Sequence, residues 1–256
     1  MSAIESILRW LHVFVGIIWI GHLYFFNFVN GAFAGTMDAD TKKKVVPELM
    51  PRALFWFRYG ALWTWITGVL LLAMVFYHGG TVLEDGNWTL WTFLMIAVTF
   101  LAAPVYDVLM KSIKDIRIAG AVGLVLLGVI LFLMQNQGGF SYRGYNIHAG
   151  VLFGTIMAFN VWMRIWPAQK KIITAIKNGE KPDPDVVALA GTRSRHNTYL
   201  SMPLLWAMLN THTTYFAGGN LCMSSQCGWV TFLAFTIVGW AVINLCYRQA
   251  AQVKGF

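Results

Sequence analysis

The chain has 256 residues, of which 57% are apolar, 15% are aromatic and only 12% are charged. Because soluble domains usually carry about a quarter charged residues, this composition excludes an ordinary soluble domain and a disordered chain, and it indicates a membrane protein. Three cysteines are too few for disulfides to stabilise a fold of this length, which excludes a disulfide scaffold. The net charge of +8 is typical of a multispanning protein with basic cytoplasmic loops.

Seven stretches with few or no charged residues are long enough to cross a bilayer, which takes about 20 apolar residues in a helix. The last two are separated by a glycine-containing stretch between residues 218 and 228. We therefore predict an all-α fold, a polytopic transmembrane helical bundle that forms a single integral membrane domain over residues 1–256. The predicted spans cover residues 7–28, with an extension to 34 left open, 57–77, 88–109, 118–135, 145–166, 198–216 and 229–247.

The number of basic residues in the connections alternates between high and low along the chain. The connections after the first, third and fifth spans and the C-terminal tail are basic. The connection after the second span has only Glu84 and Asp85, the one after the fourth has only Arg143, and the one after the sixth has none. By the positive-inside rule, the N-terminus lies outside and the C-terminus is cytoplasmic. Since topology accounts for these charges, we expect the lipid bilayer and no nucleic acid as a partner.

The only long cytoplasmic connection covers residues 167–195. A turn at Pro182-Asp183-Pro184-Asp185 precedes residues 186–195, which we predict to form a short amphipathic helix along the membrane surface. Two further charged residues, Arg58 and Asp107, lie inside predicted spans near the cytoplasmic side. We expect these two residues to form a structural ion pair.

Three histidines on three different spans are predicted to lie at similar depth in the outer leaflet. His12 is about two turns into the first span, His148 is about one turn into the fifth, and His212 is near the outer end of the sixth. Ionisable side chains inside a membrane tend to mark function, and facing helices of a bundle commonly hold a haem or metal through imidazole. We therefore predict one haem b whose iron has two of these histidines as axial ligands, with the third at its edge or in a substrate pocket.

A second, inner site is suggested by two deeper histidines. His22 lies about 15 Å below His12, and His196 opens the sixth span at the inner interface. If both bind iron, the protein would hold two haems and carry electrons across the membrane. The alternatives for the outer histidines are a three-histidine copper or zinc site without haem, or simple helix packing.

Two arginines at the outer edge are expected to bind the propionates of an outer haem. Arg9 lies about one turn before His12, and Arg143 lies just before the fifth span. Glycines on the first, fourth and fifth spans would provide clearance for a flat porphyrin, although small residues also let transmembrane helices approach closely.

The cysteines predict a disulfide and exclude one kind of haem attachment. Cys222 and Cys227 lie in the outer connection after the sixth span, where we expect a small disulfide, with a copper site as the alternative. No Cys-x-x-Cys-His motif occurs in the sequence, so covalent c-type haem attachment is excluded.

Four stretches together carry a family resemblance. They begin with Arg9-Trp10-Leu11-His12 in residues 9–28, with Arg52-Ala53-Leu54-Phe55 in residues 52–58, with His148-Ala149-Gly150 in residues 148–161, and with Arg193-Ser194-Arg195-His196-Asn197 in residues 193–212. In these residues the chain resembles the membrane domain of the bacterial cytochrome-c-fused urate oxidases, the PuuD or urate oxidase N-terminal family, over nearly its whole length.

The resemblance implies a redox function in the bacterial inner (cytoplasmic) membrane. Its pattern points to His12, His148, His196 and His212 as site residues and does not include His22. Family members of this type continue into an external cytochrome c domain that this sequence lacks, so we expect electrons to pass to a separate cytochrome c, quinone or membrane-complex partner. The leading interpretation is a haem b electron-transfer protein. The alternatives are a urate-oxidase-like membrane oxidoreductase and a non-redox accessory subunit.

Overall fold

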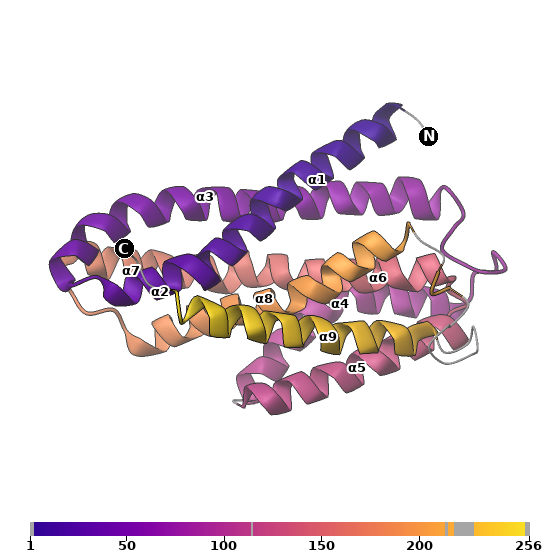
Figure 1. Ribbon diagram of the computed structural model, residues 1–256. Coiled ribbons are helices and arrows are strands. Elements are labelled where there is room, and N and C mark those ends of the chain that lie inside the picture. The colour runs from indigo at the N-terminus through magenta and orange to yellow at the C-terminus, as the bar shows by residue number, and fades with distance from the viewer. Residues whose placement is uncertain (1–2, 114, 213–214, 218–227, 254–256) are drawn as a thin grey trace. The chain divides into compact units, whose positions relative to one another are not determined.

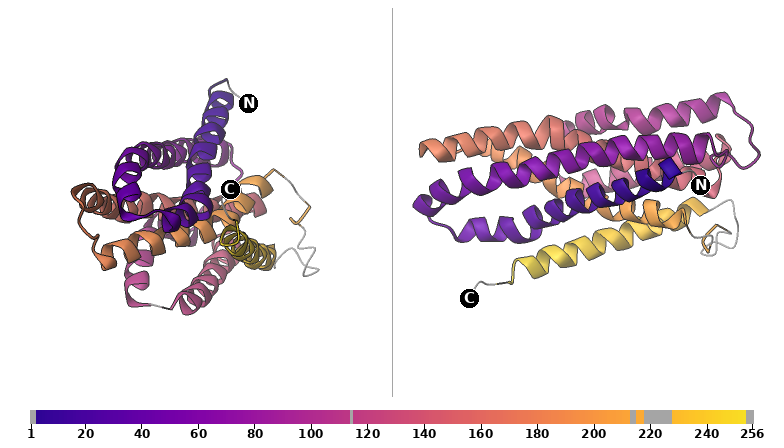
Figure 2. Two further views of the ribbon diagram at one scale, coloured as in Figure 1. Left: turned by 60° about the vertical axis from the view of Figure 1, so that its left-hand side comes forward. Right: turned by 90° about the horizontal axis from the view of Figure 1, so that it is seen from above.

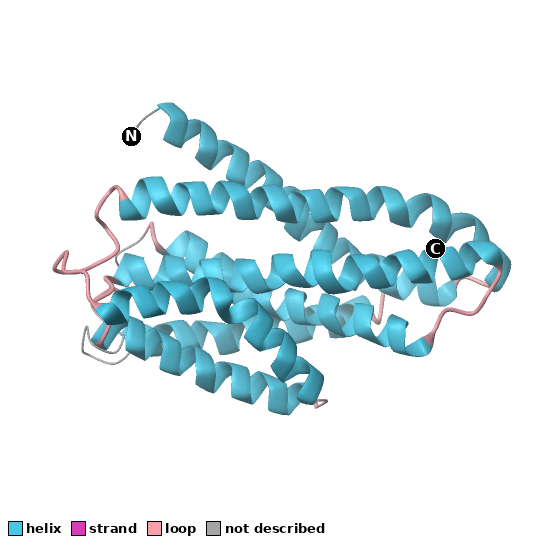
Figure 3. Ribbon diagram, turned by 180° about the vertical axis from the view of Figure 1, so that it is seen from behind, coloured by secondary structure: helices cyan, strands magenta, loops and turns pink. Residues whose placement is uncertain are grey.

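The structure, a computed structural model, describes residues 3–113, 115–212, 215–217 and 228–253. Within these residues the chain is helical and contains no strand, apart from an isolated antiparallel bridge between Leu83 and Phe140 (Figure 3). The all-α fold predicted from composition is confirmed.

Most of the helices up to α8 follow one another through short connections (Figure 1). Three six-residue π-helical segments interrupt or extend them: η1 (Phe25–Asn30), η2 (Leu72–Tyr77) and η3 (Asn160–Ile165). The α-helices are α1 (Ala3–Tyr24), α2 (Gly31–Thr36), α3 (Ala39–Leu71), α4 (Leu90–Ser112), α5 (Ile116–Asn136), α6 (Tyr142–Phe159), α7 (Trp166–Asn178), α8 (Pro184–Asn210) and α9 (Gly228–Ala250).

Six helical runs among the described residues are long and apolar enough to cross a membrane. They coincide with the first five and the seventh predicted spans, and each is longer than predicted because charged and polar residues continue the helix beyond its apolar part. The chain is thus a multi-pass membrane protein with a helical bundle. The runs are Ala3–Thr36, Ala39–Tyr77, Leu90–Ser112, Ile116–Asn136, Tyr142–Asn178 and Gly228–Ala250.

The sixth predicted span, residues 198–216, differs from the structure. Helix α8 is a single helix of 27 residues, so the helix expected over residues 186–195 continues without a break into the predicted span. Helix α8 then ends at Asn210, and its polar residues keep it out of the six apolar runs. Three of those polar residues are fully buried, which explains how the bundle accommodates them: Asn197, Thr198 and Ser201.

Two connections that were expected to be loops are largely helical. Helix α3 begins at Ala39, so the basic residues assigned to the first loop lie on its first turns. Helix α7 prolongs the fifth span to Asn178. Gly179 follows as its C-cap, with a φ of +79° in the left-handed region that favours glycine. The orientation of the chain, which depended on these basic residues, stays a prediction.

The described residues form two compact units. The first unit lies within residues 1–5, 68–156 and 202–239, and the second within residues 6–67, 157–201 and 240–256. In the first unit, α4 and α5 run side by side as an antiparallel hairpin (Figures 1 and 2). The hydroxyl of Thr92 at the start of α4 donates to the carbonyl oxygen of Gly138 after α5, 2.9 Å away, which closes the hairpin.

In the second unit, α1 and α3 approach closely at a glycine. A Cβ atom at Gly60 would lie 3.0 Å from the backbone nitrogen of Trp19, so only glycine fits this crossing without displacing α1. The side chain of Trp19 is buried at the same crossing.

Candidate functional site

His148 is the most completely buried histidine of the described residues, with a relative exposure of 0%. Helix α6 places it in the first unit, where its Nδ1 lies 2.7 Å from the carbonyl oxygen of Gly144, one turn earlier. A carbonyl oxygen only accepts hydrogen bonds, so Nδ1 carries the proton in the neutral imidazole. The lone pair of the ring is therefore on Nε2.

The hydroxyl group of Tyr77 is the hydrogen-bond donor to that lone pair on Nε2. The hydroxyl oxygen lies 2.8 Å from Nε2 of His148, although the two residues are 71 positions apart. Tyr77 is the last residue of the π-helical segment η2, and such segments occur frequently at functional sites because they reorient side chains within a helix. The ring of Phe140 packs edge-on against the imidazole at 4.8 Å and completes an apolar wall.

The connections that precede α4 and α6 hold Tyr77 and His148 together. The backbone N–H of Ser141 donates to the carbonyl of Val82 at 2.8 Å, and its hydroxyl donates to the carbonyl of Thr81, also at 2.8 Å. A Cβ atom at Gly144 would run into the carbonyl oxygen of Val82. Gly144 therefore lets the connection after η2 lie against α6, and it also positions the imidazole through its own carbonyl.

Arg143 lies on α6 just before Gly144, and its side chain has unused hydrogen-bonding capacity. Its Nε is buried without a hydrogen-bond partner, and its guanidinium lies 5.7 Å from the ring of Phe76. An unsatisfied guanidinium in a buried setting is well suited to bind a carboxylate or another anion. The preceding residue, Tyr142, accepts a hydrogen bond from the side-chain amide of Asn210 at the end of α8.

The other two histidines of the first unit are exposed. His78 follows Tyr77 directly, and His212 lies in the turn after α8. His148 and His212 were both predicted as ligands of the outer haem, and of the two the structure buries only His148.

His12 occupies the interior of α1 in the second unit. Its Nδ1 lies 2.9 Å from the hydroxyl oxygen of Thr67, and that hydroxyl donates to the carbonyl of Trp63 at 2.7 Å. The threonine oxygen thus accepts from Nδ1–H of His12, which leaves Nε2 as the basic nitrogen, as in His148. Arg9, the second predicted propionate ligand, is half-buried on the same helix.

The two inner histidines also belong to the second unit. The Nδ1 of His22 lies 2.7 Å from the carbonyl of Ile18, and its ring is 6.4 Å from that of Phe26. His196 lies on α8 and is 9% exposed. An inner haem held by this pair stays a prediction.

A comparison with protein families identifies the chain's relatives. The model of the family described as urate oxidase N-terminal matches residues 31–254. The chain belongs to the urate oxidase N-terminal family. Tyr77, Arg143 and His148 lie within the range that the family model matches, whereas His12 and His22 precede it. Neither a curated protein nor a solved structure matches this family member.

The grouping of the outer histidines in this urate oxidase N-terminal family member stays a prediction, because His148 and His212 belong to the first unit and His12 to the second. Among the described residues, no group of three or more His, Cys, Asp or Glu side chains could hold a metal ion. A haem with two axial histidines needs no such group. Cys222 and Cys227, the predicted disulfide, lie outside the described residues, and Cys246 on α9 is a free thiol.

The second unit contains a buried polar cluster that the sequence did not single out. The side-chain amide of Asn27 donates to Ser194 at 2.8 Å and accepts from the hydroxyl of Tyr247, also at 2.8 Å. The amide of Asn160 donates to that of Asn197 at 2.8 Å, and both residues are 0% exposed. The signal that could have marked this cluster was an uncharged amide inside a predicted span, which applies to Asn27 and Asn160.

The ion pair expected between Arg58 and Asp107 stays a prediction, because the two residues belong to different units. Asp107 pairs with Lys111 on its own helix at 3.0 Å. Arg58 is surrounded by aromatic rings, and none of the described carboxylates of its own unit forms an ion pair with it.

Proposed function

We propose that this member of the urate oxidase N-terminal family binds b-type haem through His148 and passes electrons to a separate partner in the membrane or at its surface. The observation that carries the proposal is the fully buried imidazole of His148, whose Nδ1 is fixed by the carbonyl of Gly144 and whose Nε2 bears the lone pair. Metal-ligating histidines almost always have this second hydrogen bond, which orients the ring and raises its basicity.

The residues around His148 fit a haem in two further respects. Arg143 has a buried, unpartnered Nε, which supports its predicted role as a ligand for a propionate carboxylate. Phe140 and the burial of the site keep water away from the imidazole. When bound, the haem would supply one-electron redox chemistry at its iron.

Binding of iron by His148 requires a change in the hydrogen bond that Tyr77 makes to it. The hydroxyl of Tyr77 occupies Nε2 of His148, the nitrogen that an iron would need. Haem binding therefore requires Tyr77 to give up this hydrogen bond, after which its hydroxyl is available to donate elsewhere in the site. In the absence of haem, the same bond keeps the buried nitrogen satisfied.

The second axial ligand would be His12 or His212, as predicted from the sequence. In His12, Nδ1 is fixed by hydrogen bonding and Nε2 is the basic nitrogen. The inner histidines, His22 and His196, would extend the path to a second haem. The partner is a cytochrome c, a quinone or another membrane complex, and the location is the bacterial inner membrane.

The proposal is tested by the absorption spectrum of the purified protein, expressed with an adequate haem supply. We expect a Soret band and reduced α and β bands of a six-coordinate b-type haem, together with iron in equimolar amount by metal analysis. Single changes of His12, His148 and His212 to Ala identify the axial pair as the two that alter the reduced spectrum. A copper or zinc content without a Soret band would contradict the proposal.

Urate oxidation is the second candidate function, and family membership is the observation that favours it. It predicts that urate added without oxygen reduces the bound haem, whereas xanthine, which has the same ring system, does not. A haem that is reduced by a quinol but not by urate would assign the chain to electron transfer alone.

A further inference from the structure

Arg58 on α3 lies within a cage of aromatic rings in the second unit. Its guanidinium carbon is 3.8 Å from the centre of the Trp166 indole and 5.3 Å from that of the Tyr59 ring. The ring of Trp162 lies at 5.7 Å, and the indole N–H of Trp162 donates to the backbone carbonyl of Arg58 at 3.1 Å. Aromatic residues of α3, of η3 and of the first turn of α7 thus hold the guanidinium at a defined position.

A second cation lies against the same indole. Lys170 follows Trp166 by one turn of α7, and its ammonium nitrogen is 5.5 Å from the indole centre. Lys170 is exposed, and it lines an open depression along α7 with Lys171 and Glu180, a set with a net positive charge. Stacking on an aromatic face orients both cations but does not neutralise either of them.

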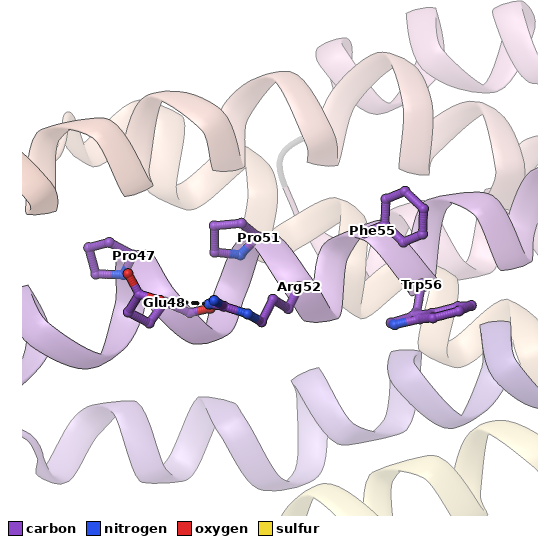
Figure 4. Close-up of a pocket in the computed structure, with 6 residues that line it drawn as sticks. All are labelled: Pro47, Glu48, Pro51, Arg52, Phe55 and Trp56. Carbon is purple, nitrogen blue, oxygen red and sulfur yellow. Dashed lines mark hydrogen bonds and ion pairs between the residues drawn. The ribbon is translucent and has the colours of Figure 1, made fainter.

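Arg58 forms no ion pair with the described carboxylates of its own unit, unlike the nearest arginine on the same helix. Arg52 forms an ion pair with Glu48 at 2.7 Å on an open face of α3 that also includes Pro47, Pro51, Phe55 and Trp56 (Figure 4). Aromatic rings surround the guanidinium of Arg58, and its Nε is buried without a hydrogen-bond partner. An anion from outside the protein would compensate the charge of Arg58 and accept a hydrogen bond from its buried Nε.

The anion must reach a half-buried guanidinium beside tryptophan and tyrosine rings, where the predicted span 57–77 begins and the predicted span 145–166 ends. These aromatic residues are typical of the membrane interface, where the abundant anions are phospholipid headgroups. Since guanidinium binds a phosphate in a bidentate manner, one headgroup satisfies the buried Nε and an adjacent N–H together. We propose that Arg58 and Lys170 form a binding site for the phosphate of an anionic phospholipid, in the leaflet predicted to be cytoplasmic.

The test compares lipid retention by the full chain in nanodiscs of phosphatidylcholine with and without phosphatidylglycerol, read out by native mass spectrometry. The wild type should retain phosphatidylglycerol in preference to phosphatidylcholine. Arg58→Gln and Lys170→Gln should each weaken this binding about fivefold, the effect of one cation near a membrane surface. Arg52→Gln is the matched control, because it removes the same charge from the same helix at a position that is already paired, and it should change binding less than twofold.

Because Lys170 is exposed, its replacement does not threaten the fold, and thermal unfolding of each variant in detergent checks that the protein remains intact. Arg58→Lys keeps the charge but loses the planar stack, so it should bind the lipid between the wild type and Arg58→Gln. Equal losses in Arg52→Gln and Arg58→Gln would overturn the proposal in favour of general surface charge. Displacement of the lipid by inorganic phosphate would overturn it in favour of a soluble anion. The readout does not depend on haem, so its result is separate from that of the proposed function.

Discussion

The hydroxyl of Tyr77 donates to Nε2 of His148 across 2.8 Å, while Nδ1 of the same ring donates to the carbonyl of Gly144 at 2.7 Å. Both ring nitrogens are thereby satisfied, and the buried imidazole is neutral. Any ligand that binds Nε2 competes with Tyr77. The hydrogen bond thus links the stability of the protein without haem to its affinity for haem.

Replacing Tyr77 with Phe should separate these two effects. The change leaves a buried acceptor without a donor, so the haem-free protein should lose about 1 kcal/mol of unfolding free energy. Haem affinity should rise, because iron no longer competes with a hydroxyl. Titration of the haem-free protein with haemin measures the affinity, and thermal unfolding measures the stability. A lower affinity in Tyr77→Phe would mean that the hydroxyl supports the haem instead of competing with it.

Gly144→Ala should disturb the site without removing any functional group. Its Cβ would meet the carbonyl of Val82, so the connection after η2 must move, at a cost of about 1–3 kcal/mol, and haem binding should weaken. Gly123→Ala in α5 is the matched control, because a Cβ at Gly123 meets nothing within 4 Å. That change should be neutral or stabilising by up to about 1 kcal/mol. Equal thermal stability of the two variants would contradict the close approach at Gly144.

The amide pair in the second unit should contribute to stability. Asn197 accepts from Asn160 at 2.8 Å and donates to the carbonyl of Met157 at 3.0 Å. Asn197→Ala removes both bonds and should lower the unfolding free energy by about 1–2 kcal/mol. Asn136→Ala removes one exposed bond within α5 and should change it by less than about 0.5 kcal/mol. An effect of Asn197→Ala no larger than that of Asn136→Ala would show that the buried pair is dispensable.

The start of α3 should respond to acid. The backbone N–H and then the hydroxyl of Thr41 hold the pKa of the Asp38 carboxyl below its ordinary value of 3.8. A lowered pKa means that the carboxylate stabilises the folded state above 3.8 and loses this effect as the pH falls through the lowered value. Asp38→Asn keeps a capping side chain that does not titrate. The difference in thermal stability between the wild type and Asp38→Asn should therefore shrink in acid, and a difference independent of pH would contradict this role.

Hydropathy was sufficient to predict six of the helices that cross the membrane, because burial in lipid demands long apolar runs whatever the tertiary contacts. It did not predict α8 correctly. A hydropathy scale treats polar residues as exposed, so it placed the start of a span at the polar residues near position 198. In the structure these polar residues are fully buried within one continuous helix: Asn197, Thr198 and Ser201. The π-helical segments were not predicted, since no hydropathy pattern distinguishes them from the α-helices that they continue.

The candidate site was predictable only in part. His148 stood out because ionisable groups are rare in this chain, but Tyr77 is 71 residues away and nothing in its local sequence marks it as the partner. The surroundings of Arg58 could not be predicted, because the sequence cannot show that Trp162 and Trp166 surround the guanidinium and that Asp107 pairs with Lys111.

The spectrum of a matched pair of histidine variants tests the central claim most directly. His148→Ala removes the buried imidazole, whereas His78→Ala removes an exposed imidazole shortly after Tyr77 in the same unit. If His148 is an axial ligand, the purified wild type and His78→Ala should both show the Soret band and reduced bands of a six-coordinate haem b, and His148→Ala should lose or shift them. A wild type without a Soret band, or a spectrum that is the same in all three proteins, would contradict the account.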